Sequence, residues 1–283
     1  MTVRLILLLS LALSVRSSQS QCQYKIVAFG NSITDDGVDT NDQHGMKRYS
    51  NGPVWPNYLA RMLGCSDQNV ENYAYSGAMS NRDNYYFKDW SGTLWQVEAF
   101  LQSNPHIAPS VIVAFESGGL NDLFLNYNVN QSERSQVEAE VVTNNVLAYQ
   151  KLLKGGVSKL LILDVFTPES NCPAGEQDWF KPYISHFATS IKTVNSGLEF
   201  NVNQLKFRYP HAVIGFVSSR DLWSAMVQKF AKRKEAFTHH RDDAKYADWR
   251  QYVWFDDYHL MTDVHQLMAQ NAYKVWVSVS GKN

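Results

Sequence analysis

Four short segments, far apart in the chain, carry the residue types that a serine-dependent hydrolysis needs. They are Gly30-Asn31-Ser32-Ile33, Ser76-Gly77-Ala78, Gly119-Leu120-Asn121-Asp122 and Asp256-Asp257-Tyr258-His259. A serine hydroxyl is a weak nucleophile at neutral pH and needs a base within hydrogen-bond reach, which His259 can supply to Ser32. Asp256, in the same segment as His259, can hold the imidazole in the required tautomer. The pattern predicts Ser32, His259 and Asp256 as catalytic residues.

The same segments supply donors for the negative charge that forms on a carbonyl oxygen when a serine attacks it. Such an oxyanion needs fixed hydrogen-bond donors. The predicted oxyanion hole consists of the backbone N–H of Ser32, the backbone N–H of Gly77 and the side-chain amide of Asn121. Glycine at position 77 lets the backbone approach a substrate closely, and Asn121 donates without adding charge.

Hydrophobic patterning indicates the elements that must position these residues. Five short apolar runs suit buried parallel strands, at residues 24–29, 70–74, 111–115, 160–166 and 212–217. Helical spacing marks residues 54–63, 94–101, 137–153, 184–207 and 262–277, with Thr262 as the expected N-cap of the last helix. This alternation predicts an α/β fold, a three-layer α/β/α sandwich around a five-stranded parallel sheet.

The predicted strands place the candidate residues on one edge of that sheet. Ligands of doubly wound sheets sit beyond the carboxyl ends of the strands. Ser32 follows the first strand, Gly77 the second and Asn121 the third. We therefore expect these three residues to converge, with the loop that carries His259 anchored by the final helix.

These residues and their order resemble the GDSL, or SGNH, family of serine esterases and lipases. The family's usual blocks read Gly-Asp-Ser-Leu, Gly-x-Asn-Asp and Asp-x-x-His. The segments that contain Ser32, Asn121 and His259 stand in those places, and Gly77 stands in the second block. Residues 51–60 are similar to the first helix of the extracellular fungal and plant-like branch, which includes secreted acetylesterases of the carbohydrate esterase family 16 type. The resemblance implies a flavodoxin-like sheet and ester hydrolysis without a metal or cofactor.

The resemblance also implies short acyl esters as substrates, such as acetyl groups on plant cell-wall sugars, cleaved through a Ser-His-Asp acyl-enzyme mechanism. The sequence contains no long apolar helix of the kind that forms a lipid-binding lid. This favours substrates with small acyl groups on polar alcohols. One alternative is a lipase, phospholipase or acyltransferase that uses the same residues. Another is a catalytically silent carbohydrate-binding protein. Two departures from the family bear on activity: Asn31 replaces the usual aspartate, and Leu260 stands where proline usually follows the histidine.

The N-terminal residues have the pattern of a targeting segment. Arg4 precedes an apolar stretch at residues 6–15, and small polar residues follow, which predicts a signal peptide over 1–20 and a hydrolase domain over 21–283. The stretch is too short to span a membrane, so we expect secretion without stable membrane insertion. Without Arg4 and Arg16 the chain carries 24 Lys and Arg against 27 Asp and Glu, which suggests no nucleic-acid partner. We expect a monomer that binds a small-molecule or oligosaccharide ester.

The cysteines and one sequon fit an oxidising compartment. Three cysteines, Cys22, Cys65 and Cys172, allow one disulfide and one remaining thiol, and the sequence does not choose among the three pairings. Asn130-Gln131-Ser132 is the one Asn-x-Ser/Thr sequon in the chain, so Asn130 is a candidate glycosylation site on a surface loop.

Other residues near these segments have structural interpretations. Ser117 also follows a predicted strand but lacks the Gly-x-Ser-x-Gly elbow of α/β-hydrolases. Asp122 is expected to pack its turn rather than to pair with His259, and His265 is expected to make a structural contact. The aromatic residues closest to the four segments are expected in the core: Trp55, Tyr75, Trp90 and Trp254.

Residues 230–249 depart from the alternating pattern. We expect a solvated helix and loop there, with a mobile flap over the site as the alternative. The segment holds His239, His240, Asp242 and Asp243, whose residue types could bind a metal. Adjacent histidines point in different directions on a helix or strand, so we expect no metal site.

Overall fold

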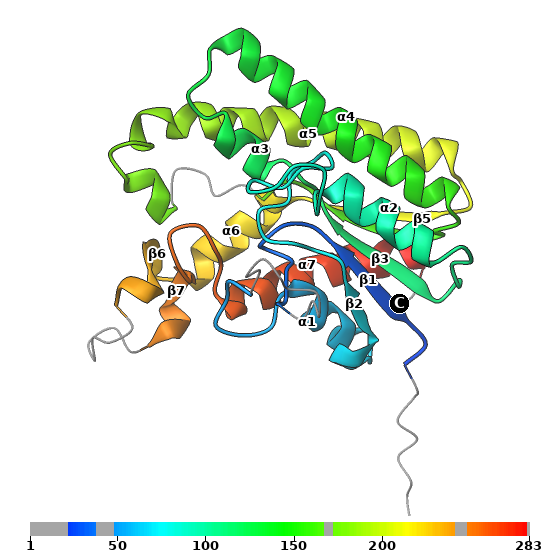
Figure 1. Ribbon diagram of the computed structural model, residues 1–283. Coiled ribbons are helices and arrows are strands. Elements are labelled where there is room, and N and C mark those ends of the chain that lie inside the picture. Colours follow the sequence, from blue (N-terminus) through cyan, green and yellow to red (C-terminus); the bar gives the residue numbers. More distant parts are fainter. Residues whose placement is uncertain (1–21, 38–47, 167–171, 241–247, 282–283) are drawn as a thin grey trace, which may run out of the picture.

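The computed structural model describes residues 22–37, 48–166, 172–240 and 248–281 (Figure 1). The predicted signal peptide, residues 1–20, lies outside the described residues. In the part of the chain that is described, no helix is both long and apolar enough to cross a membrane.

The central sheet confirms the predicted fold class. Its five strands are β1 (Lys25–Phe29), β2 (Val70–Asn72), β3 (Val111–Glu116), β4 (Lys159–Leu163) and β5 (Val213–Val217). They pair in parallel in the order β2-β1-β3-β4-β5, with Val27 opposite Val113 in the register of β1 and β3. This is the flavodoxin-like order, in which ligands bind where the strand order reverses, between β1 and β3.

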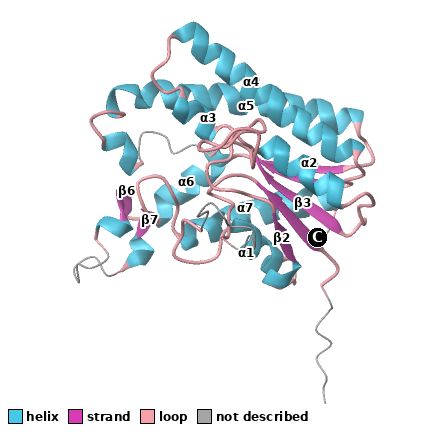
Figure 2. Cartoon of the chain, viewed as in Figure 1, coloured by secondary structure: helices cyan, strands magenta, loops and turns pink. Residues whose placement is uncertain are grey.

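Helices cover both faces of the sheet and complete the sandwich (Figures 1 and 2). The helices are α1 (Trp55–Met62), α2 (Thr93–Ser103), α3 (Leu120–Leu125), α4 (Gln131–Lys154), α5 (Ile184–Arg208), α6 (Ser219–Lys229) and α7 (Thr262–Ser280). One core, containing Ile26 and Ile112, lies under α1, α6 and α7. The other, containing Val27 and Val113, lies under α2, α4 and α5. Because both faces are covered, the strands are continuously apolar rather than alternating.

Short elements complete the described chain. The 3-10 helices are Asp67–Asn69, Pro173–Glu176, Lys181–Tyr183, Phe237–His239 and Trp249–Gln251. A second sheet contains β6 (Lys232–Ala236) and β7 (Tyr252–Trp254), which pair in parallel. The expectation of a helix in the first part of the 230–249 segment is therefore wrong. The sequence of β6 is mostly charged, so it does not have the apolar pattern that is typical of a strand. The other strand of this sheet, β7, leads directly into the segment that holds Asp256 and His259.

Two other expectations are corrected or completed by the structure. The N-cap of α7 is Met261, not Thr262, because the Thr262 hydroxyl donates to the Pro53 carbonyl (2.9 Å) instead of capping the helix. The disulfide joins Cys22 to Cys65 and so ties the chain before β1 to the end of α1. Cys172 keeps a free thiol, and burial raises its pKa to about 11, which makes it unreactive.

Candidate active site

A continuous chain of hydrogen bonds joins the three residues predicted to be catalytic. The Oγ of Ser32 lies 2.9 Å from Nε2 of His259. The other ring nitrogen, Nδ1, lies 2.7 Å from Oδ1 and 2.9 Å from Oδ2 of Asp256. The structure thus brings together residues that are 227 positions apart in the sequence. This contact pattern allows His259 to accept a proton from Ser32 while Asp256 holds the opposite side of the ring.

Asp256 is held in its ionised form. Burial opposes ionisation, but the hydrogen bond from the His259 ring, the histidine charge and the backbone N–H groups of Tyr258 and His259 outweigh it, so the pKa of Asp256 is lowered. Both N–H groups donate to Asp256 Oδ1 at 2.9 Å. A carboxylate fixed by three donors can stabilise an imidazolium without moving.

The nucleophile stands on a turn fastened at the end of β1. The Asn31 carbonyl accepts from the N–H groups of Thr34 and Asp35, and the Asn31 side chain accepts from the N–H of Ile33. Gly30, at a φ of +155°, passes close to β3, where an added Cβ would lie 2.6 Å from Oε2 of Glu116. Glycine is required at this position because the Glu116 side chain leaves no room for a Cβ atom on the turn.

Glu116 is a residue that sequence reasoning missed. It ends β3 and is fully buried, and its Oε2 accepts from the Asn31 N–H (3.3 Å) and the Thr34 hydroxyl (2.6 Å). Burial raises the pKa of Glu116 to about 7, against the lowering effect of the hydrogen bonds from the Thr34 hydroxyl and the Asn31 backbone N–H. The only available signal was a charged residue at the end of an apolar run.

This carboxylate also gives a physical reason for Asn31. An aspartate at position 31 would put a second carboxylate close to the buried carboxylate of Glu116, which already accepts from the Asn31 backbone N–H. Two adjacent carboxylates cannot both ionise cheaply in a buried site. Asparagine keeps the turn's acceptor, Oδ1, which binds the N–H of Ile33 at 3.0 Å, without adding charge. The departure from the family pattern therefore matches its surroundings in this chain.

The residues predicted for the oxyanion hole lie on the same edge of the sheet. Gly77 has a φ of +83°, a conformation that favours glycine, and it lines one cleft together with Ser32 and Asn121. One side-chain N–H of Asn121 donates to the Ala78 carbonyl (2.9 Å), and the amide has a second N–H to offer. Among the described residues, the backbone N–H groups of Ser32 and Gly77 have no acceptor. Three donors can therefore face a substrate oxygen.

Two buried carboxylates hold these donors in place. Asp35 accepts from the N–H and the hydroxyl of Ser76, both at 2.8 Å, and burial raises its pKa to about 6. Asp122 accepts from the N–H and hydroxyl of Ser80 and is itself fully packed. Asp122 thus fixes the turn, as expected, and does not contact His259.

Five tyrosine and phenylalanine rings are among the residues that line the cleft over Ser32. Its volume is about 380 Å³. The lining residues are Ser32, Tyr49, Ser76, Gly77, Tyr85, Tyr86, Leu120, Asn121, Phe124, Asp256, Tyr258 and His259. The Tyr49 ring stacks on the His259 ring with centroids 4.4 Å apart and planes 17° apart. The cleft is therefore partly apolar but carries hydroxyl groups on most of its rings.

The loop with His259 is attached to the scaffold mainly by backbone hydrogen bonds. Phe255 N–H donates to the His259 carbonyl (2.7 Å), and Met261 N–H donates to the Val253 carbonyl (2.9 Å). Leu260 is fully buried and forms an isolated bridge with Trp254. Packing of Leu260 thus secures the position that proline usually occupies in the family.

The alternative catalytic residues are engaged elsewhere. Ser117 is fully buried and its Oγ lies 2.6 Å from both the Tyr149 hydroxyl and the Leu163 carbonyl, so no substrate can reach it. His265 is also buried, and burial lowers its pKa to about 3. Both have structural roles, as expected from the sequence.

The predicted core aromatics divide into two groups. Trp55 and Trp254 are buried, with their indole N–H groups bonded to Thr34 and to the Arg233 carbonyl. Tyr75 and Trp90 pack edge to face (centroids 5.0 Å apart) but are only partly buried. None of these four rings lines the cleft.

The 230–249 segment shows no assembled metal site where it is described. His239 Nε2 lies 3.3 Å from Asp257, and His240 Nε2 lies 3.8 Å from Glu235, so the two histidines engage different partners. Asp242 and Asp243 lie outside the described residues. Within the described ranges, no group of three or more His, Cys, Asp or Glu side chains could hold a metal ion.

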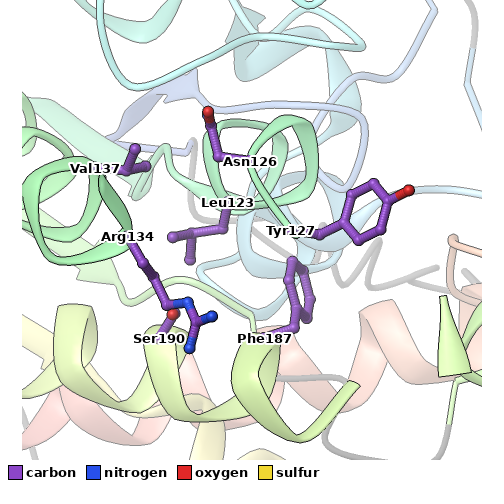
Figure 3. Close-up of a pocket in the computed structure, with 7 residues that line it drawn as sticks. All are labelled: Leu123, Asn126, Tyr127, Arg134, Val137, Phe187 and Ser190. Carbon is purple, nitrogen blue, oxygen red and sulfur yellow. The ribbon is translucent and has the colours of Figure 1, made fainter. Parts of the chain in front are cut away.

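A second hollow beside the cleft is too small for a substrate. It lies between α3, α4 and α5, and Figure 3 shows the side chains that line it, with Leu123 between Arg134 and Phe187. Its volume is about 10 Å³, which is the space of one water molecule. The hollow is therefore a packing gap, lined on one side by Tyr127, which follows α3 in the chain.

Comparison with known proteins identifies the class of molecule. A family model described as GDSL-like Lipase/Acylhydrolase matches residues 26–272. The chain is thus an ester hydrolase, as the sequence predicted. It belongs to the GDSL-like lipase/acylhydrolase family. No curated protein matches the chain in a sequence comparison.

Solved structures resemble the fold. An aryl esterase from M. smegmatis has a TM-score of 0.50 at 13% identity, with 90% of this chain and 99% of that chain covered. A catalytic mutant of an acetylxylan esterase from Geobacillus stearothermophilus has a TM-score of 0.49 at 15% identity, with 91% and 96% covered. A putative GDSL-like lipase from Parabacteroides merdae has a TM-score of 0.43 at 17% identity, with 92% and 97% covered.

Proposed function

We propose that this protein is a secreted serine esterase that removes short acyl groups, acetyl above all, from carbohydrates. The observation that carries the mechanism is the hydrogen-bonded chain from Ser32 through His259 to Asp256. The secreted fungal acetylesterase branch of the family is the proposed subgroup, and the Cys22–Cys65 disulfide supports an oxidising compartment. Asn130 is exposed at the N-cap of α4, where its Oδ1 accepts from the Glu133 N–H, so its amide nitrogen stands as the proposed glycan attachment point.

The first half of the reaction acylates the enzyme. Ser32 Oγ attacks the ester carbonyl carbon while its proton passes to Nε2 of His259. The carbonyl oxygen becomes an oxyanion, and the N–H groups of Ser32 and Gly77 and the Asn121 amide stabilise it. The intermediate then expels the sugar alkoxide, which takes the proton from His259 and leaves as the alcohol.

The second half regenerates the enzyme with water. His259 accepts a proton from a water molecule, whose oxygen attacks the acyl carbon of the Ser32 ester. A second oxyanion forms on the same three donors and collapses when the bond to Ser32 Oγ breaks. The serine oxygen recovers its proton from His259, and the carboxylic acid departs. The Asp256 carboxylate stays ionised throughout, consistent with its lowered pKa.

The lining of the cleft supports a carbohydrate alcohol. Tyr49, Tyr85, Tyr86 and Tyr258 all border it, and each ring combines an apolar face with a hydroxyl. Sugars present the same combination, with apolar C–H faces and polar rims, so tyrosine-rich clefts suit them. The aliphatic share of the lining is small, a single leucine, Leu120, which suits a short acyl group.

Hydrolysis of chromogenic acetate, butyrate and laurate esters by the wild type and a Ser32→Ala variant tests the proposal. We expect acetate turnover to be fastest and to vanish in the variant, followed by deacetylation of acetylated sugars. A preference for laurate would instead support a lipase. Equal background rates for both proteins on every ester, acetylated sugars included, would refute the hydrolase mechanism and favour a silent binder.

A further inference from the structure

The exposed aromatic side chains of this protein gather around the cleft. Six aromatic residues in the described chain are substantially exposed: Tyr85, Tyr86, Trp179, Phe200, Phe207 and Tyr258. Three of them line the cleft, and Trp179 contacts Phe124, which also lines it. Only Phe200 and Phe207 lie away from it, on α5. Exposed apolar surface that is concentrated in one place marks an interaction site.

Trp179 extends this surface beyond the cleft. Three successive ring contacts lead to it from the base: His259 to Tyr258 (6.3 Å between centroids), Tyr258 to Phe124 (5.5 Å) and Phe124 to Trp179 (5.7 Å). Trp179 is therefore connected to the reaction centre through packed side chains, yet it is not among the residues that line the cleft over Ser32.

The Trp179 ring is fixed but not buried. It packs against Phe124, Tyr127 and Phe180 with centroid distances of 5.7, 5.4 and 5.3 Å, and the residue still exposes 43% of its surface. A core tryptophan in this protein, such as Trp254, exposes 1%. A ring held rigid at the surface loses little entropy when it binds a ligand, so it is preorganised for stacking.

We propose that Trp179 forms a distal carbohydrate subsite, on which a neutral sugar unit stacks one or more positions along the chain from the unit being deacetylated. This inference rests on the proposed function and narrows it to oligosaccharide or polysaccharide esters. The ring chain through Phe124 and Tyr258 makes the subsite continuous with the cleft.

The surroundings of Trp179 favour a sugar chain as the occupant. The exposed aromatic rings around the cleft are Tyr and Trp, which carry polar atoms. Asp178, which directly precedes Trp179 in the chain, is exposed and carries a carboxylate that can accept hydrogen bonds. Sugars bind through this combination of a flat apolar face and a polar edge. A lipid surface would instead be matched by a contiguous aliphatic patch.

The test compares substrates of different length. The rates of the wild type, Trp179→Ala and the matched control Phe207→Ala are measured on p-nitrophenyl acetate and on acetylated xylose, xylotriose and xylohexaose. We expect kcat/KM of the wild type to rise with chain length. In Trp179→Ala the value for xylohexaose should fall by about three- to tenfold, through KM, with p-nitrophenyl acetate unchanged. Phe207→Ala should match the wild type throughout.

Different results separate the possible failures. Equal wild-type efficiency on acetylated xylose and xylohexaose would overturn the subsite and leave the esterase intact. A Trp179→Ala loss that is the same on p-nitrophenyl acetate would also overturn it, because it would show a folding role. If the enzyme turns over p-nitrophenyl acetate but no acetylated sugar, both the carbohydrate substrate and the subsite are refuted.

Direct binding tests the subsite without turnover. Unacetylated xylohexaose is titrated by calorimetry into Ser32→Ala and into the double variant with Trp179→Ala. We expect Kd to be about three- to tenfold weaker in the double variant. The same Kd for both proteins, or no binding to either, would contradict the proposal.

Discussion

The two halves of the site are built in different ways. The half at the sheet edge, with Ser32, Gly77 and Asn121, stands on turns whose polar groups bind buried carboxylates at Asp35, Glu116 and Asp122. The other half is a single loop, residues 256–259, whose Asp256 and His259 mainly bind each other and the loop's own backbone. Donors that must not move are thus embedded in the interior, while the groups that transfer protons lie closer to solvent.

This difference separates two kinds of defect. Changes in the loop should remove activity and leave the fold intact, because few interior contacts are lost. Changes in the carboxylates under the sheet edge should reduce stability, because a buried polar group left without its partner costs free energy. Four predictions, in order of decreasing effect, test this separation.

Replacing the base should produce the largest loss. We expect His259→Ala to lower kcat on p-nitrophenyl acetate by a factor on the order of 10⁶, because Ser32 loses its base, with little change in melting temperature. The control is His106→Ala, which removes an exposed histidine from the chain that precedes β3 and should keep full activity. A His259→Ala variant that unfolds would show that the loop is as structural as the sheet edge.

Removing one oxyanion donor should have a smaller effect. Asn121→Ala should lower kcat by about 10²- to 10³-fold with KM nearly constant, since the donor acts mainly in the transition state. Asn126→Ala provides the control. Asn126 is the C-cap residue of α3, its side-chain amide donates to the Asp122 carbonyl, and it does not line the cleft. A loss confined to KM would contradict the role of Asn121.

The pair of Asn31 and Glu116 should control stability. Asn31→Asp adds a second carboxylate to the buried site and should reduce the free energy of unfolding by about 3–5 kcal/mol at pH 8. Adding Glu116→Gln removes the first carboxylate, so the double variant should recover most of the loss. Chemical denaturation of the four proteins of this cycle measures the coupling. Purely additive effects would show that the two side chains do not interact.

The pH dependence of stability should be the smallest effect. The folded pKa of Glu116, about 7, exceeds its ordinary value of 4.5, so the folded protein retains a proton that the unfolded chain has lost. The resulting stabilisation is fully present below pH 4.5 and is lost as pH rises through 7. Between pH 5 and 8 the free energy of unfolding should therefore fall by about 1–3 kcal/mol less in Glu116→Gln than in the wild type.

The control for that measurement is Glu138→Gln, which changes a partly exposed carboxylate on α4. It should leave the slope unchanged. Asp35 and Asp164, with pKa values raised by burial to about 6 and about 7, should contribute a residual decline of the same sign in every variant. An increase in stability over this range would contradict the account of the buried carboxylates.

The sequence predicted the positions of the sheet and of the reacting groups because both depend on local signals. Apolar runs marked all five strands, and the polar residues after them marked the edge where Ser32, Gly77 and Asn121 meet. The supporting network was not predictable in this way. Glu116 lies 85 positions from Asn31, and nothing in the run of β3 indicates that its carboxylate turns back to that residue.

Elements with ambiguous patterns were also missed. The charged residues of β6 resemble a solvated helix, and its pairing with β7 depends on a partner 20 residues away. Thr262 has a side chain typical of an N-cap, but its hydroxyl binds the Pro53 carbonyl of a distant loop. The disulfide pairing likewise needed the approach of α1 to the start of β1. In each case a tertiary contact decided between local alternatives.

The proposed mechanism requires Ser32 to be the nucleophile and His259 to activate it. Labelling with a fluorophosphonate, followed by mass spectrometry of the modified peptide, tests it most directly. We expect one adduct, on Ser32, which persists in Ser117→Ala and is lost or strongly slowed in His259→Ala. An adduct on Ser117 or any other serine, or an unchanged labelling rate in His259→Ala, would contradict it.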